Sequence, residues 1–165
     1  MKRFVQVLAG IILTLTVVLC GVLLYLRTSS PVFQGGSVLI VSPADQPALW
    51  ASWMKLLDSD AVPHGETEDR SLFVFDVRLK NPGPIPVEWI GMTPELRPDE
   101  TLVWTDNGSL VLAAQSEGTL KAAILSGKTD ETAPRELTVS GYRLGEKVDI
   151  RLLADKNGIR MKGEE

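Results

Sequence analysis

Cysteine is almost absent from this sequence of 165 residues, and the one that occurs is Cys20. No disulfide can therefore form within the chain, and a folded domain must be stable through its hydrophobic core alone. Cys20 also lies inside a long apolar run. That position excludes it as the nucleophile of a folded enzyme.

Histidine is equally scarce, since His64 is the only one. A Ser-His-Asp triad would depend on it, and no Gly-x-Ser-x-Gly elbow accompanies it. The glycines at 35–36 and 141 open no phosphate-binding loop before a helix. We therefore expect no catalytic residues and no cofactor. A carboxylate pair of the kind that glycosidases use stays open, because the chain has 21 acidic residues and none stands out as a pair.

Positive charge is outnumbered by negative charge over most of the chain. Three of the 17 basic residues lie at or before Arg27, and all 21 acidic residues lie beyond it. This leaves 14 basic against 21 acidic side chains, a net charge of −7 after Arg27. Nucleic acids and anionic lipids bind to clustered Lys and Arg, so we expect no nucleic-acid partner.

Apolar residues are concentrated at the start of the chain. Residues 4–26 contain no charged side chain. A helix of that length is about 35 Å long, enough to cross a hydrocarbon core of about 30 Å. We interpret residues 1–27 as an N-terminal signal-anchor, a single transmembrane helix that reaches the membrane through residues 4–26.

A cleaved secretory signal is the alternative interpretation of this segment. Its apolar region usually has about 7 to 15 residues, which is shorter than the run here. Pro31 follows the loosely suitable Thr28-Ser29-Ser30 and would hinder cleavage. The sequence favours the uncleaved anchor.

The charges that flank the anchor predict its orientation. Lys2 and Arg3 precede the apolar run, and only Arg27 follows it closely. Because Lys and Arg are retained on the cytoplasmic side, we expect a cytoplasmic N-terminus and a C-terminal domain outside the cell membrane. The three-residue tail is too short for a signalling domain.

Residues 28–36 are rich in Ser, Pro and Gly, and we interpret them as a linker. The extracytoplasmic domain then occupies residues 37–165, with a first strand over 37–41. A short helix is predicted over 45–57, where Asp45 can cap and Pro47 suits the first turn. Trp50 and Trp53 fall on its apolar face, where core packing is favoured over a ligand platform.

The segment 58–69 gathers the potential metal ligands of the chain. The candidates are Asp58, Asp60, His64 and Glu66. Their order fits neither a calcium loop nor the short His and Cys spacings of zinc sites. A solvated acidic loop is the favoured interpretation, and we expect no bound metal.

The rest of the chain predicts β-strands. From Ser71 onward, Phe73, Phe75, Val77 and Leu79 alternate with the residues between them, which indicates a strand with one apolar face. Further strands are expected over 86–92, 101–105, 109–114, 119–125, 136–144 and 147–153. Asn107-Gly108 predicts a tight hairpin between the strands over 101–105 and 109–114. About seven to eight short strands and one helix indicate an all-β fold, a β-sandwich.

Residues 77–87, read Val-Arg-Leu-Lys-Asn-Pro-Gly-Pro-Ile-Pro-Val, resemble the strand, turn and strand passage of bacterial immunoglobulin-like extracytoplasmic domains. The likeness covers about 11 residues, and the Cys-Trp-Cys pattern of true immunoglobulin domains is missing. The resemblance implies an immunoglobulin-like sandwich used for adhesion, spacing or assembly. It assigns no functional residue.

The expected function is a non-catalytic interaction or assembly module that binds another membrane or envelope protein. Two alternatives stay open: a module that binds a small ligand, a glycan or a metal, and a hydrolase based on carboxylates. Trp89 and Trp104 are the first surfaces to test for a partner, although we expect both in the core.

Overall fold

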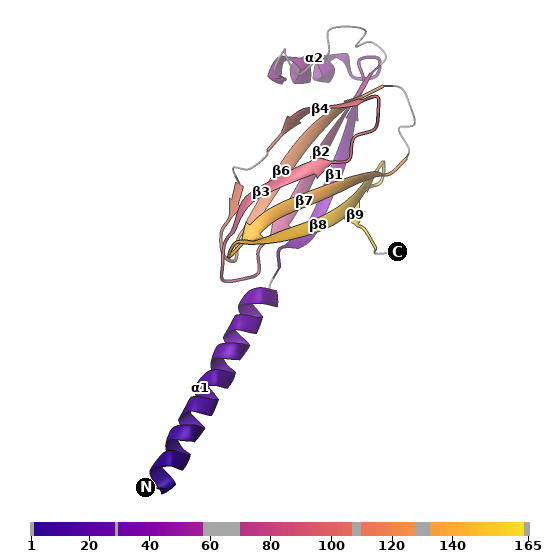
Figure 1. Cartoon of the computed structure of the whole chain (residues 1–165). Helices are drawn as coiled ribbons and strands as arrows, with labels where there is room; N and C mark the ends of the chain where they lie inside the picture. Colours follow the sequence, from indigo (N-terminus) through magenta and orange to yellow (C-terminus); the bar gives the residue numbers. More distant parts are fainter. Residues whose placement is uncertain (1, 29, 58–69, 107–109, 128–132, 164–165) are drawn as a thin grey trace.

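A computed structural model gives the arrangement of the chain and describes residues 2–28, 30–57, 70–106, 110–127 and 133–163. Its elements in chain order are α1 (Lys2–Thr28), β1 (Val32–Val41), α2 (Pro47–Leu56), β2 (Ser71–Lys80), β3 (Val87–Pro94), β4 (Glu100–Thr105), β5 (Leu110–Leu112), β6 (Glu117–Ser126), β7 (Arg135–Arg143), β8 (Glu146–Asp155) and β9 (Gly158–Met161). The strands form a β-sandwich, α1 extends from one end of it, and α2 lies at the other end (Figure 1).

The sandwich consists of two antiparallel sheets. One has the strand order β1-β2-β6-β4, and the other has the order β5-β3-β7-β8-β9. The predicted all-β fold with one short helix and an N-terminal apolar helix is confirmed. Seven to eight strands are predicted, and the described residues form nine. The additional strand is β9, which pairs with β8 after a turn at Lys156 and Asn157.

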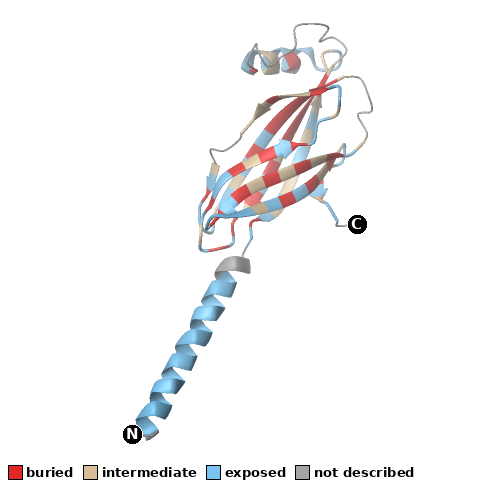
Figure 2. Cartoon of the chain, viewed as in Figure 1, coloured by how far each residue is buried: buried red, intermediate tan, exposed pale blue. Residues whose placement is uncertain are grey.

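The core between the sheets follows the alternation predicted for β2. Phe73, Phe75, Val77 and Leu79 all point inward and are buried. Ile124, Ala122 and Leu120 lie on the neighbouring strand β6, and Leu137 and Leu152 face them from the second sheet. Each fully buried side chain of this size contributes roughly 1.5–3 kcal/mol, so this layer dominates the stability of the domain. Burial alternates along the strands in Figure 2.

Strand β1 begins at Val32, five residues before the strand expected from the sequence. Most of the predicted linker 28–36 is therefore part of the sheet. A bulge lies between Phe33 and Gly35, and Gly35 has a φ of 149°. A Cβ on Gly36 would lie 2.6 Å from the carbonyl oxygen of Asp76. Gly35 thus serves the bulge and Gly36 serves close strand packing, and composition alone cannot distinguish either role from a flexible linker.

The hairpin predicted at Asn107-Gly108 is wrong. Strand β4 pairs with β6, whereas β5 pairs with β3 in the other sheet. The connection between β4 and β5 therefore passes from one sheet to the other, and residues 107–109 lie outside the described residues. The turn chemistry of Asn-Gly is local, but the choice of sheet depends on partners distant in sequence.

Helix α2 begins at Pro47, and Gln46 takes the N-cap position without a side-chain cap. The predicted cap Asp45 instead accepts a hydrogen bond from the Ser42 hydroxyl at 2.8 Å. The helix packs Trp50 against the outward face of the first sheet, where Leu72, Val74, Ala123 and Leu125 form a second apolar cluster. The core role expected for Trp50 is confirmed, since it is buried.

Helix α1 is apolar and exposed along its described length (Figure 2). Residues 3–25 are long and apolar enough to cross a membrane, as an anchor or as a signal sequence. The hydroxyls of Thr14 and Thr16 donate hydrogen bonds to the backbone carbonyl oxygens four residues earlier, each at 2.9 Å. These bonds satisfy both threonine hydroxyls within the helix, as a hydrocarbon environment would require.

Candidate interaction surface

Trp89 occupies an irregular position in β3. Glu88 pairs with Tyr142 on β7, and Gly91 pairs with Ser140, so β3 has one residue more than its partner between these pairs. The same stretch is irregular on the other side, where Val87 pairs with Leu112. Trp89 is thus the extra residue of a β-bulge that is shared by both neighbouring strands.

The bulge changes which side chains face the core. Val87 and Ile90 are three residues apart, yet both are buried between the sheets. Glu88 and Trp89 lie between them and are both exposed. Gly141 on β7 permits this arrangement, because a Cβ there would lie 2.9 Å from Val87 Cγ1 and 3.2 Å from Ile90 Cγ1. The core position expected for Trp89 is wrong, since strict alternation would have placed it beside Val87.

The backbone of Trp89 is in the left-handed region, with a φ of 55°. Glycine usually fills such a bulge position, since a side chain there costs roughly 1–2 kcal/mol. Burial does not compensate this cost, because 66% of Trp89 is exposed. A large apolar side chain held outward on a strained backbone is typical of a residue kept for binding.

Two further exposed apolar residues lie beside Trp89 on the outward face of the second sheet. Val111 on β5 lies opposite the bulge, between the pairs Val87 with Leu112 and Ile90 with Leu110. Tyr142 on β7 pairs with Glu88. Both are exposed. We call Val111, Trp89 and Tyr142 the apolar row; it crosses three neighbouring strands of one sheet.

The tryptophans near α2 form a different arrangement. Trp53 and Trp104 make an edge-to-face contact with ring centroids 6.5 Å apart. Both are half-buried and pack against the apolar cluster beneath α2. Trp104 therefore fixes the helix to β4 and contributes to the core as expected, which leaves Trp89 as the exposed member of the pair singled out from the sequence.

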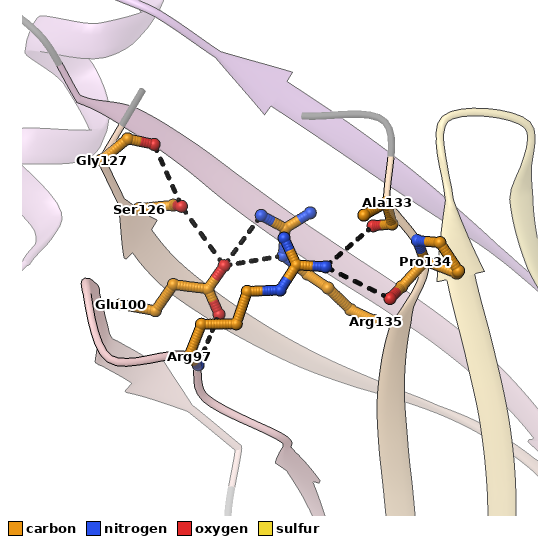
Figure 3. Close-up of polar contacts among 7 residues, drawn as sticks. All are labelled: Arg97, Glu100, Ser126, Gly127, Ala133, Pro134 and Arg135. Carbon is orange, nitrogen blue, oxygen red and sulfur yellow. Dashed lines mark hydrogen bonds and ion pairs between the residues drawn. The ribbon is translucent and has the colours of Figure 1, made fainter. Parts of the chain in front are cut away.

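A buried ionic cluster lies at the end of the sandwich farther from α1. Arg135 Nε and Nη2 donate to Glu100 Oε1 at 3.0 and 2.8 Å, and Ser126 Oγ donates to the same oxygen at 3.2 Å (Figure 3). Glu100 Oε2 accepts from the backbone N–H of Arg97 at 3.1 Å. The Arg135 guanidinium also lies 3.8 Å from the Phe73 ring centroid. Side chains from β4, β6 and β7 contribute to the cluster, so it links these three strands and has a structural role.

Exposed charged side chains form ion pairs elsewhere on the two sheets. Gln34 and Lys80 donate hydrogen bonds to Glu117 and lower the pKa of its carboxyl. Ser140 and Lys147 do the same for Asp149, whose pKa is also lowered. Both carboxylates are ionised at neutral pH, so neither suits the role of a general acid.

The predicted metal candidates Asp58, Asp60, His64 and Glu66 lie outside the described residues. Within the part of the chain that the structure describes, no group of three or more His, Cys, Asp or Glu side chains could hold a metal ion. No sequence signal distinguishes the apolar row beyond the presence of Trp89, because a bulge that turns it outward depends on the pairing of three strands.

Comparisons with known proteins give no family. The sequence matches no protein-family model and no curated protein. Similar solved structures include the cupredoxin domain of amoB from Nitrosocaldus yellowstonii, at 10% identity and a TM-score of 0.39, covering 72% of this chain and 84% of that one. The yeast GGA1 GAE domain is similar at 9% identity and a TM-score of 0.35, covering 61% and 96%. At these values, the likeness carries no functional assignment.

Proposed function

We propose that the protein is a single-pass membrane protein whose outer domain binds another membrane or envelope protein through the apolar row. In this proposal α1 is retained as an anchor with a cytoplasmic N-terminus, and the sandwich lies outside the cell membrane. The single observation that carries the proposal is Trp89, exposed on a strained backbone where glycine would be expected.

The chemistry of the apolar row fits a protein partner. Aromatic residues are enriched in the centres of protein interfaces, and they bury large areas at a small cost in side-chain entropy. Glu88 lies beside Trp89, and Thr93 and Thr138 continue the same outward face. An apolar centre with a polar rim is the usual composition of an interface that forms between separately stable proteins.

The position of the row favours a partner in the same membrane. Trp89 is near the start of β3 and Tyr142 is near the end of β7, and Val111 lies beside the β3 bulge. The start of β3 and the end of β7 are the ends of these strands closer to α1 (Figure 1). A partner held in the same bilayer would present its own outer segment at this height. Tethering both proteins to one membrane raises their effective concentration, so a small apolar contact is sufficient for association.

Site-specific photo-crosslinking in intact cells tests this function. A photoreactive residue at Val111 is expected to capture one dominant membrane or envelope protein. Thr119 provides the matched control position, because it is exposed on the outward face of the other sheet. Equal capture from Thr119 would contradict the proposed surface, and so would the absence of a specific product from Val111.

The variant Trp89→Asn makes the test specific to the apolar row. Asn tolerates the left-handed backbone, so the bulge and the fold are retained while the apolar side chain is lost. We expect the Val111 crosslink to disappear in this variant, with protein level and melting temperature preserved. A crosslink of unchanged yield in Trp89→Asn would show that the captured protein does not bind through the row.

A further inference from the structure

The turn between β7 and β8 has an unusual residue at its tip. Leu144 and Gly145 have φ values of 50° and 78°, so both are left-handed. A two-residue hairpin turn of this kind strongly prefers Asn-Gly, because Asn tolerates a positive φ and leucine does not. Leu144 thus occupies the position where a small polar residue would stabilise the turn.

Packing within the domain does not explain this choice. Leu144 is 70% exposed, although a leucine in a strained turn would need burial to offset the cost. Natural hairpin tips are polar where they face water, because an exposed leucine gains nothing from the hydrophobic effect. The side chain is therefore suited to an apolar environment outside the sandwich.

A cavity of about 630 Å³ joins this hairpin to the anchor helix. Leu23 of α1 and Ser30 line it on one side, and Leu144 lines it on the other. Leu23 belongs to the membrane-crossing part of α1. The tip of the hairpin therefore lies beside the last apolar turns of the helix, where the hydrocarbon core of a bilayer gives way to head groups extending about 5–8 Å on each side.

Apart from Val148, the remaining lining of the cavity consists of charged side chains of both signs. The cationic members are Arg143 and Lys147, and the anionic members are Glu146 and Asp149. Lys147 Nζ and Asp149 Oδ2 are 3.0 Å apart, and their side chains are 55% and 41% exposed, so the two charges lie together at the cavity wall. A zwitterionic phospholipid head group carries the complementary pair, a phosphate for the cations and an ammonium group for the carboxylates.

We propose that the β7–β8 turn enters the membrane interface with Leu144 and that the adjoining cavity holds the head group of a zwitterionic phospholipid. The proposal rests on α1 being a retained anchor, as in the proposed function, but it does not depend on the apolar row. Insertion of Leu144 offsets the strain of the turn, and the head group fills the space between helix and hairpin. The sandwich is then fixed to the bilayer at two points.

Depth-dependent quenching in nanodiscs of phosphatidylethanolamine and phosphatidylcholine tests the insertion. The full chain carries Cys20→Ser and Leu144→Cys, with an environment-sensitive fluorophore on the new cysteine. We expect lipids with a nitroxide near the head group to quench most of its emission. The same label on Leu96→Cys is expected to stay bright. Leu96 is exposed and directly precedes Arg97, whose backbone N–H binds Glu100 at the far end of the sandwich.

A label on the native Cys20 separates the two proposals. Quenching of this label by a nitroxide in the bilayer centre shows that the anchor is inserted. If Cys20 is quenched and Leu144→Cys is not, the hairpin proposal is overturned while the anchor stands. If Cys20 is not quenched, the proposed anchoring itself fails.

The variant Leu144→Asn tests the head-group cavity without a risk of misfolding, because it restores the preferred turn residue. We expect its melting temperature in detergent to rise. Native mass spectrometry of the wild type released from detergent is expected to retain one phosphatidylethanolamine molecule, and the variant is expected to lose it. Equal retention by the two proteins, or no retained lipid in the wild type, would overturn the assignment of the cavity.

Discussion

Arg135 and Glu100 form a buried ion pair in which Nη2 lies 2.8 Å from Oε1, and their side chains are only 3% and 0% exposed. They come from different sheets, because β7 carries Arg135 and β4 carries Glu100. The pair therefore connects the two layers of the sandwich at the end where α2 packs. Removing one partner would leave the other charge buried without a counter-charge.

Replacing Arg135 by Met is expected to destabilise the domain by about 3–5 kcal/mol, because Glu100 would stay buried without its counter-charge. Chemical denaturation of the full chain in detergent measures the change. Arg160→Met is the matched control, since Arg160 lies 3.9 Å from Asp155 and is largely exposed. A surface pair of this kind contributes about 0–1 kcal/mol. Similar losses in both variants would contradict the role of burial.

Asn81 closes the end of the sandwich near α1, and its loss is expected to cost about 1–3 kcal/mol. Its buried Nδ2 donates to the carbonyl oxygens of Ile85 and Ala113 at 2.7 and 3.1 Å, and Oδ1 accepts from the Gly83 N–H. Asn81→Leu leaves these backbone groups without their partner. The control Asn157→Leu changes an exposed turn residue. Equal falls in the melting temperature of the two variants would contradict the stabilising role of the Asn81 hydrogen bonds.

Gly36 is expected to tolerate no side chain. In Gly36→Ala the new Cβ meets a backbone oxygen of Asp76 and the side chain of Ile159, so β1 must move away from its neighbours. Overpacking of this kind costs about 1–3 kcal/mol. Ser37→Ala, one residue further along the same strand, is the control because Ser37 is exposed. Denaturation midpoints that match between the two variants would count against close packing at Gly36.

The Glu117 interactions are expected to weaken in acid. Its pKa is lowered in the folded domain from the ordinary value of 4.5, mainly by the hydrogen bonds from Gln34 and Lys80. A lowered folded pKa gives stability that is present above 4.5 and is lost as the pH falls through the folded pKa. The melting temperature of the wild type should therefore fall more steeply below pH 4.5 than that of Glu117→Gln. Parallel curves would contradict the expectation.

Retention of α1 is expected in the mature protein. The intact mass of the chain purified from membranes should include residues 2–28, and an alkaline wash should leave the chain in the pellet. A mature chain that begins after Thr28 and is released by the wash would establish a cleaved signal. That result would remove the membrane from the proposed function while leaving the apolar row intact.

The sequence predicts the fold well where strands are regular. The inward face of β2 is read directly from Phe73, Phe75, Val77 and Leu79, because each points to the same side of an unbroken strand. Strands β6, β7 and β8 lie within a few residues of the predicted ranges for the same reason. Regular alternation is a local property, so it can be recognised without knowledge of the pairing partner.

The candidate surface could not be predicted in the same way. Trp89 is exposed only because a bulge adds one residue to β3 relative to both neighbours, and the pairing of Glu88 with Tyr142 has no local signature. The ion pair of Glu100 and Arg135 joins residues 35 positions apart. The failure of the predicted Asn107-Gly108 hairpin likewise follows from strand pairing, because β4 pairs with β6 and β5 pairs with β3. Each of these features follows from long-range pairing, which composition and periodicity do not encode.

The short connection between α1 and β1 has a mechanical consequence. Helix α1 ends at Thr28 and β1 begins at Val32, so the stalk has three residues and spans at most about 10 Å. With α1 retained as the proposed anchor, a stalk of this length would keep the domain within a thin layer above the bilayer. Its encounters would then be with molecules that diffuse in the same membrane, and a tilt of the helix would also tilt the sandwich.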